Sequence, residues 1–197
     1  VSPENTPTLE LQKKLGFAEK PYRTFNSLIN DGDIMFEKQL GQIYKAVPVS
    51  SRFDVRIIAD IYNKNLEALH GDKISYAEWL SSIMSNDTDE KNYLICRGIM
   101  PVAWLKINGL DDTDVGYISM LAVIPQFQRS GVGTFAVEFA ESFLHSEGKK
   151  IVCVQTTYDN IPAVRLYEKC GFERVAEAPP LANRSSGTPK IKFIKKI

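Results

Sequence analysis

The sequence has little of what would direct it to a membrane, a metal or a nucleic acid. No uninterrupted apolar run in its 197 residues approaches the roughly 20 that a membrane helix requires. It has only two histidines and three cysteines, and no Cys/His cluster with ligand spacing, so no metal site is expected. The 24 acidic and 24 basic residues balance, so no overall charge attracts the chain to nucleic acid or to a membrane surface. Internal repeats and low-complexity tracts are absent as well.

The three cysteines, Cys96, Cys153 and Cys170, are odd in number and widely spaced. On the strands and helix expected around them, this distribution is typical of reduced, mostly buried thiols. Since the sequence as given also shows no signal peptide, we expect a cytoplasmic protein. An apolar content of 44% is ordinary for a globular enzyme with one substantial core and a modest appendage.

A glycine-bearing turn, residues 127–134, lies between a strand-like run and an amphipathic helix. The strand is expected over residues 115–124. The apolar face of the helix comprises Val132, Phe135, Ala136, Phe139, Ala140, Phe143 and Leu144. In this order, unpaired backbone N–H groups and the positive end of the helix dipole converge on one place, which favours an anion. Gly131 and Gly133 would let a phosphate approach the backbone without meeting a Cβ atom.

Two familiar nucleotide-binding motifs do not fit this turn. A Rossmann turn requires Gly-x-Gly-x-x-Gly and an acidic residue roughly 20 positions later. A Walker loop requires Gly-Lys-Ser/Thr, whereas Gly133 is followed by Thr134 and Phe135. The spacing Gln128-x-x-Gly131-x-Gly133 instead resembles the pyrophosphate-binding turn of the GNAT superfamily of N-acetyltransferases, which bind coenzyme A there.

A second segment, residues 159–172, agrees with this resemblance. It has the marks of a short helix: Asp159 or Asn160 as N-cap, Pro162 in the first turn, and Gly171 at the left-handed C-terminal position. One face of the helix would carry Ala163, Leu166, Tyr167 and Cys170. The segment is similar to the GNAT pattern Asn-x-x-Ala-x-x-Leu-Tyr-x-x-x-Gly-Phe at every position. In that family, the asparagine contacts the cofactor and the tyrosine hydroxyl approaches its sulfur.

The remaining pattern fits the fold that this resemblance implies. Strands are predicted at residues 42–49, 92–97, 100–108, 115–124, 151–156, 172–178 and 191–196, and helices at about 54–71, 76–84, from 132 onward, and 160–170. The resemblance covers about residues 42–197. It implies a mixed α/β (α+β) domain in which helices flank a central, mostly antiparallel sheet of about seven strands.

Residues 1–41 lie outside the resemblance and form a predicted N-terminal extension. Short helices are expected around Leu11 and Leu15 and around Phe25, Leu28 and Ile29, followed by strand-like residues 34–36. The extension is interpreted as a helical arm that packs on the acetyltransferase domain or on a second subunit, which leaves a homodimer open.

The alternative for the extension is a partial winged helix-turn-helix. Its candidates for phosphate contacts are Lys13, Lys14, Lys20 and Arg23. Acids and bases are about equal in this segment and a first helix would be missing, so nucleic-acid binding is not favoured.

The resemblance implies an acetyl-CoA-dependent N-acetyltransferase and assigns roles to named residues. The main chain of Leu121, Ala122 and Val123 would hold the thioester and stabilise an oxyanion. The pyrophosphate would be bound by Gln128, Arg129, Ser130, Gly131, Val132, Gly133 and Thr134. Asn160 and Ala163 would contact the cofactor. Tyr167 would be the general acid that protonates the departing thiolate, the alternative being an aromatic that fills the core beside Phe172.

The acceptor is expected to be a small-molecule or peptide amine, and no residue is a persuasive general base. Tyr117, Ser119 and Leu121 alternate along their strand and are predicted to share one face, so Tyr117 and Ser119 are candidates for the acceptor cleft. Tyr76 and Trp79, on the second helix, are further candidates, with core packing as the alternative.

Two other classes of function stay open at this stage. A non-catalytic acyl-CoA sensor would keep the phosphate turn without acetyl transfer. A DNA-binding regulator with a fused acetyltransferase domain would use residues 1–41.

Overall fold

The computed structural model describes most of the chain. The described residues are 6–14, 18–20, 35–37, 44–69, 71–85, 87–112, 114–175 and 190–197. Contacts divide the chain into two compact units, Val1–Ile43 and Tyr44–Ile197, and each is described by itself. None of the described helices is both long enough and apolar enough to cross a membrane.

In the first unit, helix α1 (Thr6–Lys14) occupies the position predicted for the first short helix. Strands β1 (Ala18–Lys20) and β2 (Met35–Glu37) pair antiparallel, with Ala18 opposite Glu37. Strand β1 was not predicted from the sequence. The second helix predicted there lies outside the described residues.

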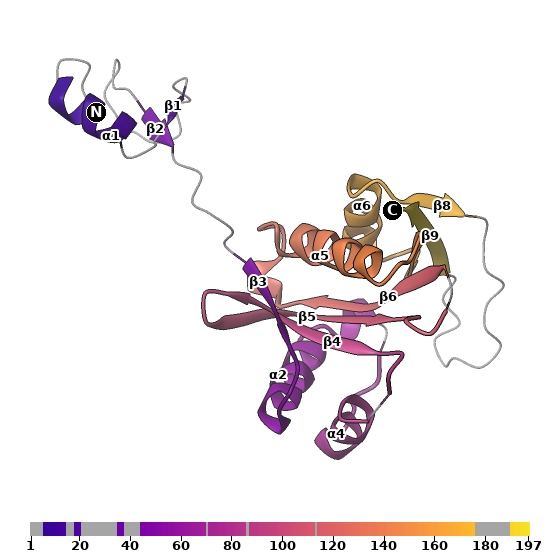
Figure 1. Ribbon diagram of the computed structural model, residues 1–197. Helices are drawn as coiled ribbons and strands as arrows, with labels where there is room; N and C mark the ends of the chain where they lie inside the picture. Colours follow the sequence, from indigo (N-terminus) through magenta and orange to yellow (C-terminus); the bar gives the residue numbers. More distant parts are fainter. Residues whose placement is uncertain are drawn as a thin grey trace. The chain divides into compact units, whose positions relative to one another are not determined.

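The second unit is a seven-stranded sheet with helices on both faces (Figure 1). The strands are β3 (Tyr44–Pro48), β4 (Lys91–Arg97), β5 (Met100–Asn108), β6 (Val115–Val123), β7 (Ile151–Thr157), β8 (Glu173–Val175) and β9 (Lys190–Lys196). Their order is β3-β4-β5-β6-β7-β9-β8, and every neighbouring pair is antiparallel except β6 and β7. The predicted mixed α/β fold with a mostly antiparallel sheet is therefore confirmed.

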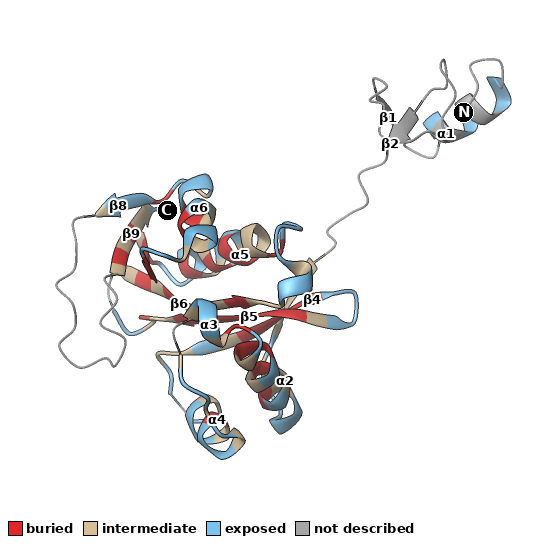
Figure 2. Ribbon diagram, turned by 180° about the vertical axis from the view of Figure 1, so that it is seen from behind, coloured by how far each residue is buried: buried red, intermediate tan, exposed pale blue. Residues whose placement is uncertain are grey.

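The two faces of the sheet each carry a hydrophobic core. Helices α5 (Val132–Ser146) and α6 (Ile161–Lys169) cover one face, and α2 (Arg52–Asn63) and α4 (Tyr76–Ile83) cover the other (Figure 1). Buried residues lie on the helix sides that face the sheet (Figure 2). The core under α5 contains aliphatic side chains of β5, β6 and β7, whereas the core under α2 is built around Trp79 and Trp104.

The prediction of one continuous helix over residues 54–71 is wrong. A capping box begins α2: the Ser51 hydroxyl accepts from the Asp54 N–H, and the Asp54 carboxylate accepts from the Ser51 N–H. The helix ends at Asn63, and a short separate helix, α3 (Leu66–Leu69), follows. The break lies at Asn65, whose side-chain amide bonds back to the backbone, an arrangement that competes with helix continuation.

The prediction that Tyr117, Ser119 and Leu121 share one face of β6 is also wrong. Along β5, the consecutive residues Lys106 and Ile107 lie opposite Met120 and Ile118, so Ser119 is an extra residue that forms a β-bulge. Beyond the bulge the alternation is inverted. Leu121 therefore packs in the same core as Ile118, on the α5 side of the sheet.

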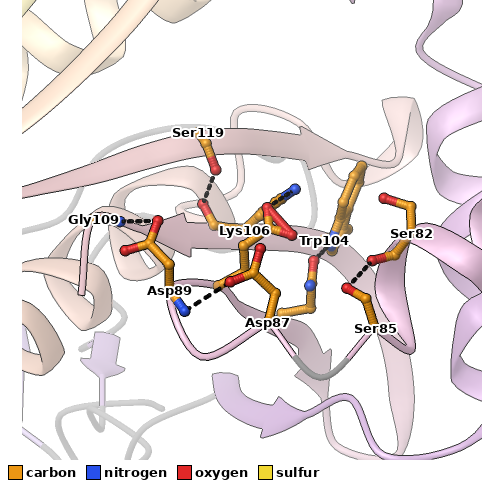
Figure 3. A network of polar contacts seen from close by, with 10 residues as sticks. Ser82, Ser85, Asp87, Asp89, Trp104, Lys106, Gly109 and Ser119 are labelled. Carbon is orange, nitrogen blue, oxygen red and sulfur yellow. Dashed lines mark hydrogen bonds and ion pairs between the residues drawn. The ribbon is translucent and has the colours of Figure 1, made fainter. Parts of the chain in front are cut away.

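Hydrogen bonds to one carboxylate fix the turn between β5 and β6. Asp89 accepts from the backbone N–H groups of Gly109 (3.1 Å) and Asp111 (3.0 Å), and Figure 3 shows the Gly109 bond. From the other side, the buried Lys149 donates to the carbonyl oxygens of Leu110 (2.7 Å) and Asp112. The Asp111 N–H lowers the pKa of the Asp89 carboxyl, against a smaller opposing effect of burial.

We expect Asp89→Ala to lower the free energy of unfolding at pH 7 by about 1–2 kcal/mol, because two backbone donors lose a charged acceptor. The pKa of Asp89 is depressed in the folded state, so its contribution is present above the ordinary aspartate pKa of about 3.9 and is lost as pH falls through the folded value. Urea denaturation at pH 7 and at acidic pH measures both effects. An unchanged difference between the proteins at the two pH values would contradict this account.

Candidate functional site

Strands β6 and β7 separate part-way along their length. They pair in parallel only from Val115–Ile151 to Ile118–Val154, although β6 continues to Val123 and β7 to Thr157. The bulge at Ser119 lies where the pairing stops. Beyond that point, the backbone of residues 119–123 no longer pairs with β7, so polar main-chain groups border the opening between the two strands.

The segment that follows β6 is a tight turn into α5. A short 3-10 helix, Pro125–Phe127, leads into it, and the turn contains two residues with left-handed backbone, Arg129 (φ 59°) and Gly131 (φ 95°). Gly131 is the N-cap of α5, and no side chain caps this end of the helix. The first N–H groups of a helix have no intrahelical acceptor, so those of α5 are directed at the turn with the positive end of the helix dipole.

Glycine is required at Gly131 and at Gly133 for different physical reasons. A Cβ added at Gly131 would meet nothing within 4 Å, so its left-handed φ is what requires glycine. A Cβ at Gly133 would lie 3.0 Å from Cδ2 of Leu166 on α6, so this glycine allows α5 and α6 to pack closely. Gly133 therefore positions the second candidate segment against the first.

Side chains far away in the sequence stabilise this turn. The hydroxyl of Tyr44, on the edge strand β3, donates to the carbonyl oxygen of Ser130 (3.0 Å) and contacts its hydroxyl (3.2 Å). Ser130 in turn donates to the Phe127 carbonyl (2.5 Å). Tyr44 was not predicted as part of the site, because no local pattern connects it to a residue 86 positions later.

Helix α6 begins at the opposite side of the opening. Asn160 is its N-cap, with its side-chain oxygen accepting from the Ala163 N–H (3.3 Å). Its side-chain amide donates to the Ala68 carbonyl (3.3 Å), on α3. The structure thus brings together three segments, of which the sequence analysis had connected only two.

A pocket of about 450 Å³ lies where these segments meet. Its lining comprises Lys64, Asn65, Glu67 and Ala68 from the α2–α3 region, Pro125 and Gln128 from the turn, and Asp159, Asn160 and Pro162 from the start of α6. Thr157 ends β7 next to this region, and its hydroxyl is buried without a hydrogen-bond partner among the described residues. Of the predicted cofactor residues, Gln128 and Asn160 line this pocket, whereas residues 121–123 and 129–134, Ala163 and Tyr167 are not part of its lining.

Tyr167 lies on α6 with its side chain 5% exposed. Its ring packs against Phe172 and Phe193, each with centroids 5.8 Å away. Burial raises the pKa of the Tyr167 hydroxyl far above its ordinary value, with a further contribution from Cys170. The phenol is therefore protonated across the physiological pH range and can act as a hydrogen donor.

The chain matches the family described as "Acetyltransferase (GNAT) family" over residues 56–172, which is more than half of its length. The chain belongs to this family. GNAT enzymes use acetyl-CoA as the acetyl donor. The matched span contains the turn, the opening between β6 and β7, and all of α6.

Two curated relatives match short parts of the chain. Mycothiol acetyltransferase from Stackebrandtia nassauensis is 32% identical over 71 residues, which make up 36% of this chain and 23% of that protein. N-alpha-acetyltransferase 30 from Schizosaccharomyces pombe is 30% identical over 59 residues, 30% of this chain and 39% of that protein. The match therefore spans less than half the length of either relative.

Solved GNAT structures share the fold over most of the chain. The spermidine N-acetyltransferase from Vibrio cholerae, in complex with CoA and spermine, superposes with a TM-score of 0.67. It is 15% identical in sequence, and the superposition covers 78% of this chain and 95% of that one. At this identity, the likeness concerns the fold.

Within this GNAT domain, the four acceptor candidates lie outside the pocket lining. Trp79 is buried between Tyr62 and Trp104 in edge-to-face contacts. The Tyr76 hydroxyl donates to the Arg52 carbonyl (2.9 Å). Tyr117 packs beside Gly109, and the Ser119 hydroxyl donates to the Lys106 carbonyl (3.3 Å) at the bulge (Figure 3).

Among the described residues, no group of three or more His, Cys, Asp or Glu side chains could hold a metal ion. The cysteines are free: Cys96 and Cys153 are buried, and Cys170 is half-buried. Burial raises the pKa of all three thiols, which favours their protonated form near neutral pH.

Proposed function

We propose that this GNAT domain is an acetyl-CoA-dependent N-acetyltransferase that acetylates a primary amine by direct attack in a ternary complex. The observation that carries the proposal is that the turn between β6 and the uncapped α5 N-terminus and the start of α6, which follows β7, line one pocket beyond the point where β6 and β7 separate. This arrangement offers backbone donors to a diphosphate and main-chain groups to a thioester.

The residues present fit acetyl-CoA at the diphosphate end. In the turn from Gln128 to Thr134, open space at Gly131 would admit a phosphate oxygen close to the backbone N–H groups. Arg129 is exposed and adds a positive charge beside them. Asn160 and Ala163 would border the pantetheine arm from the α6 side of the pocket.

The chemistry divides between the main chain and one side chain. When bound, acetyl-CoA supplies an activated acetyl thioester. The backbone of Leu121, Ala122 and Val123, on the part of β6 that has left β7, would orient the acetyl carbonyl and stabilise negative charge on its oxygen. Tyr167, a buried and protonated phenol, would donate its proton to the departing sulfur.

The acceptor is proposed to be a small-molecule or peptide amine. The names of the relatives suggest the classes to be tried first: spermidine for the Vibrio cholerae enzyme, and an α-amine for N-alpha-acetyltransferase 30. Tyr76, Trp79, Tyr117 and Ser119 remain candidates for its contacts, with the first two now placed in or beside the core under α2.

Calorimetric titration with acetyl-CoA and CoA tests cofactor binding, and release of free thiol in the presence of an amine panel tests transfer. We expect saturable heat with both ligands, and thiol release with at least one of spermidine, free amino acids and peptides with a free α-amine. Binding without thiol release for any amine would instead indicate a non-catalytic sensor. Folded protein that gives no heat with either ligand would contradict the proposal altogether.

A further inference from the structure

The connection between α2 and α3 contacts both segments proposed to bind the cofactor. Asn65 Oδ1 accepts a hydrogen bond from Nε2 of Gln128 in the phosphate turn (3.4 Å). Three residues later, the Ala68 carbonyl accepts from the Asn160 side chain at the start of α6 (3.3 Å). Asn65 and Ala68 also line the pocket. The α2–α3 connection thus holds the two sides of the site to one another.

The orientation of the Asn65 amide is determined by its surroundings. The residue is only 7% exposed, so both ends of its side chain need partners. Its nitrogen donates to the Ile61 carbonyl (2.8 Å), which leaves the oxygen for Gln128. A flipped amide would place oxygen against oxygen at Ile61 and donor against donor at Gln128. Only one orientation therefore satisfies both contacts.

The Gln128 side chain connects Asn65 to the end of strand β6. Its Nε2 group donates to Asn65 and also to the Val123 carbonyl (3.2 Å), the last residue of β6. A continuous series of hydrogen bonds therefore runs from the end of α2 through Gln128 to the end of the strand proposed to orient the acetyl group.

We propose that Asn65 is a positioning residue of the cofactor site: it fixes Gln128, and through Gln128 the start of the phosphate turn and the end of β6. This inference rests on the proposed acetyltransferase function and deepens it. Asn65 is not proposed to touch the reacting atoms. Its effect is on the geometry in which acetyl-CoA binds.

A double-mutant cycle of Asn65→Ala and Gln128→Ala tests the inference, with the KM for acetyl-CoA and kcat measured for all four proteins. Each single variant is expected to raise the KM about fivefold, the equivalent of one ordinary hydrogen bond, and to leave kcat within about twofold. In the Gln128→Ala background, adding Asn65→Ala is expected to change the KM by less than about twofold, because the Gln128 side chain through which Asn65 acts is already absent.

A residue that only terminates α2 would give a different result. The loss of its bond to Ile61 would act independently of Gln128, so the two KM effects would multiply, and that outcome overturns the inference. Asn65→Asp is a second variant in case the alanine variant does not fold. It retains an oxygen for Gln128 and loses the donor to Ile61, so we expect a lower melting temperature with a KM within about twofold of wild type.

Failure of this inference can be distinguished from failure of the proposed function. Wild-type protein that binds acetyl-CoA but shows multiplying effects in the cycle removes the role of Asn65 alone. Wild-type protein that does not bind acetyl-CoA removes both.

Discussion

Replacement of Tyr167 by phenylalanine is expected to lower kcat by about 10²–10⁴-fold, the usual contribution of a positioned general acid. Only the hydroxyl is removed, and the ring can keep its contacts with Phe172 and Phe193. The dissociation constant for acetyl-CoA should therefore stay within about threefold of the wild-type value, because the hydroxyl is proposed to interact with the sulfur in the transition state and not in the bound ground state. Steady-state kinetics and calorimetry on the same preparation separate the two quantities.

Tyr93→Phe is a matched control for this variant. Tyr93 is likewise buried, packs against two phenylalanines, Phe139 and Phe143, and has a pKa that burial raises. It lies on β4, in neither of the two segments proposed to bind the cofactor. Its variant should keep the wild-type kcat. Equal kcat values for wild type and Tyr167→Phe would remove the catalytic assignment and leave Tyr167 as a core aromatic.

The pH dependence of Tyr167 has a definite sign. Burial raises its pKa in the folded state, so the residue favours folding while it is protonated, below the unfolded pKa of about 10. This contribution is lost as pH rises above that value. Ionisation of Tyr167 should therefore not limit activity between pH 7 and 9, and an alkaline decrease in that range would have to come from another group.

Most elements of the GNAT domain could be predicted from the sequence because each of these has a local signal. The strand over residues 100–108 has the same bounds in the structure, and the capping pair Ser51 and Asp54 lies at the start of α2. Gln128 of the segment at residues 127–134 and the start of the segment at residues 159–172 line one pocket. The residue spacing within each segment could indicate a turn and a helix start, because the geometry of turns and helix caps depends on neighbours in the sequence.

What the sequence could not predict depends on contacts between distant residues. The bulge at Ser119 inverts the faces of β6, yet residues 115–124 contain no sign of an inserted residue. The break after α2 depends on Asn65, whose side chain bonds to Ile61 and to Gln128, 63 positions away. Tyr44 reaches Ser130 across an even longer separation. The Ser119 bulge and the Tyr44 bond depend on distant residues, whereas the break after α2 also involves the local bond from Asn65 to Ile61.

The same distinction explains the acceptor candidates. Periodicity correctly placed Trp79 on the inner face of α4, but inner faces of helices line cores more often than substrate clefts. The prediction of a coenzyme turn was more specific, since it required the spacing Gln128-x-x-Gly131-x-Gly133 between a strand and the start of a helix.

The phosphate turn can be tested with two glycine variants that have similar backbone strain. Gly131 and Gly148 lie at opposite ends of α5, both have positive φ (95° and 78°), and a Cβ added to either meets nothing within 4 Å. Alanine at either position should therefore cost a similar amount of stability, about 1 kcal/mol for a non-glycine residue in left-handed backbone.

Only Gly131→Ala should weaken binding of acetyl-CoA. Its new methyl group would occupy the space through which a phosphate oxygen reaches the helix N–H groups, and the loss of one or two charge-assisted hydrogen bonds corresponds to about 10- to 100-fold in the dissociation constant. Gly148→Ala should bind acetyl-CoA as wild type does. Calorimetry with denaturation curves for both variants gives the comparison. If the two variants lose stability equally and both keep full affinity, the diphosphate does not lie against this turn, because no other difference between the two glycines remains to hide its effect.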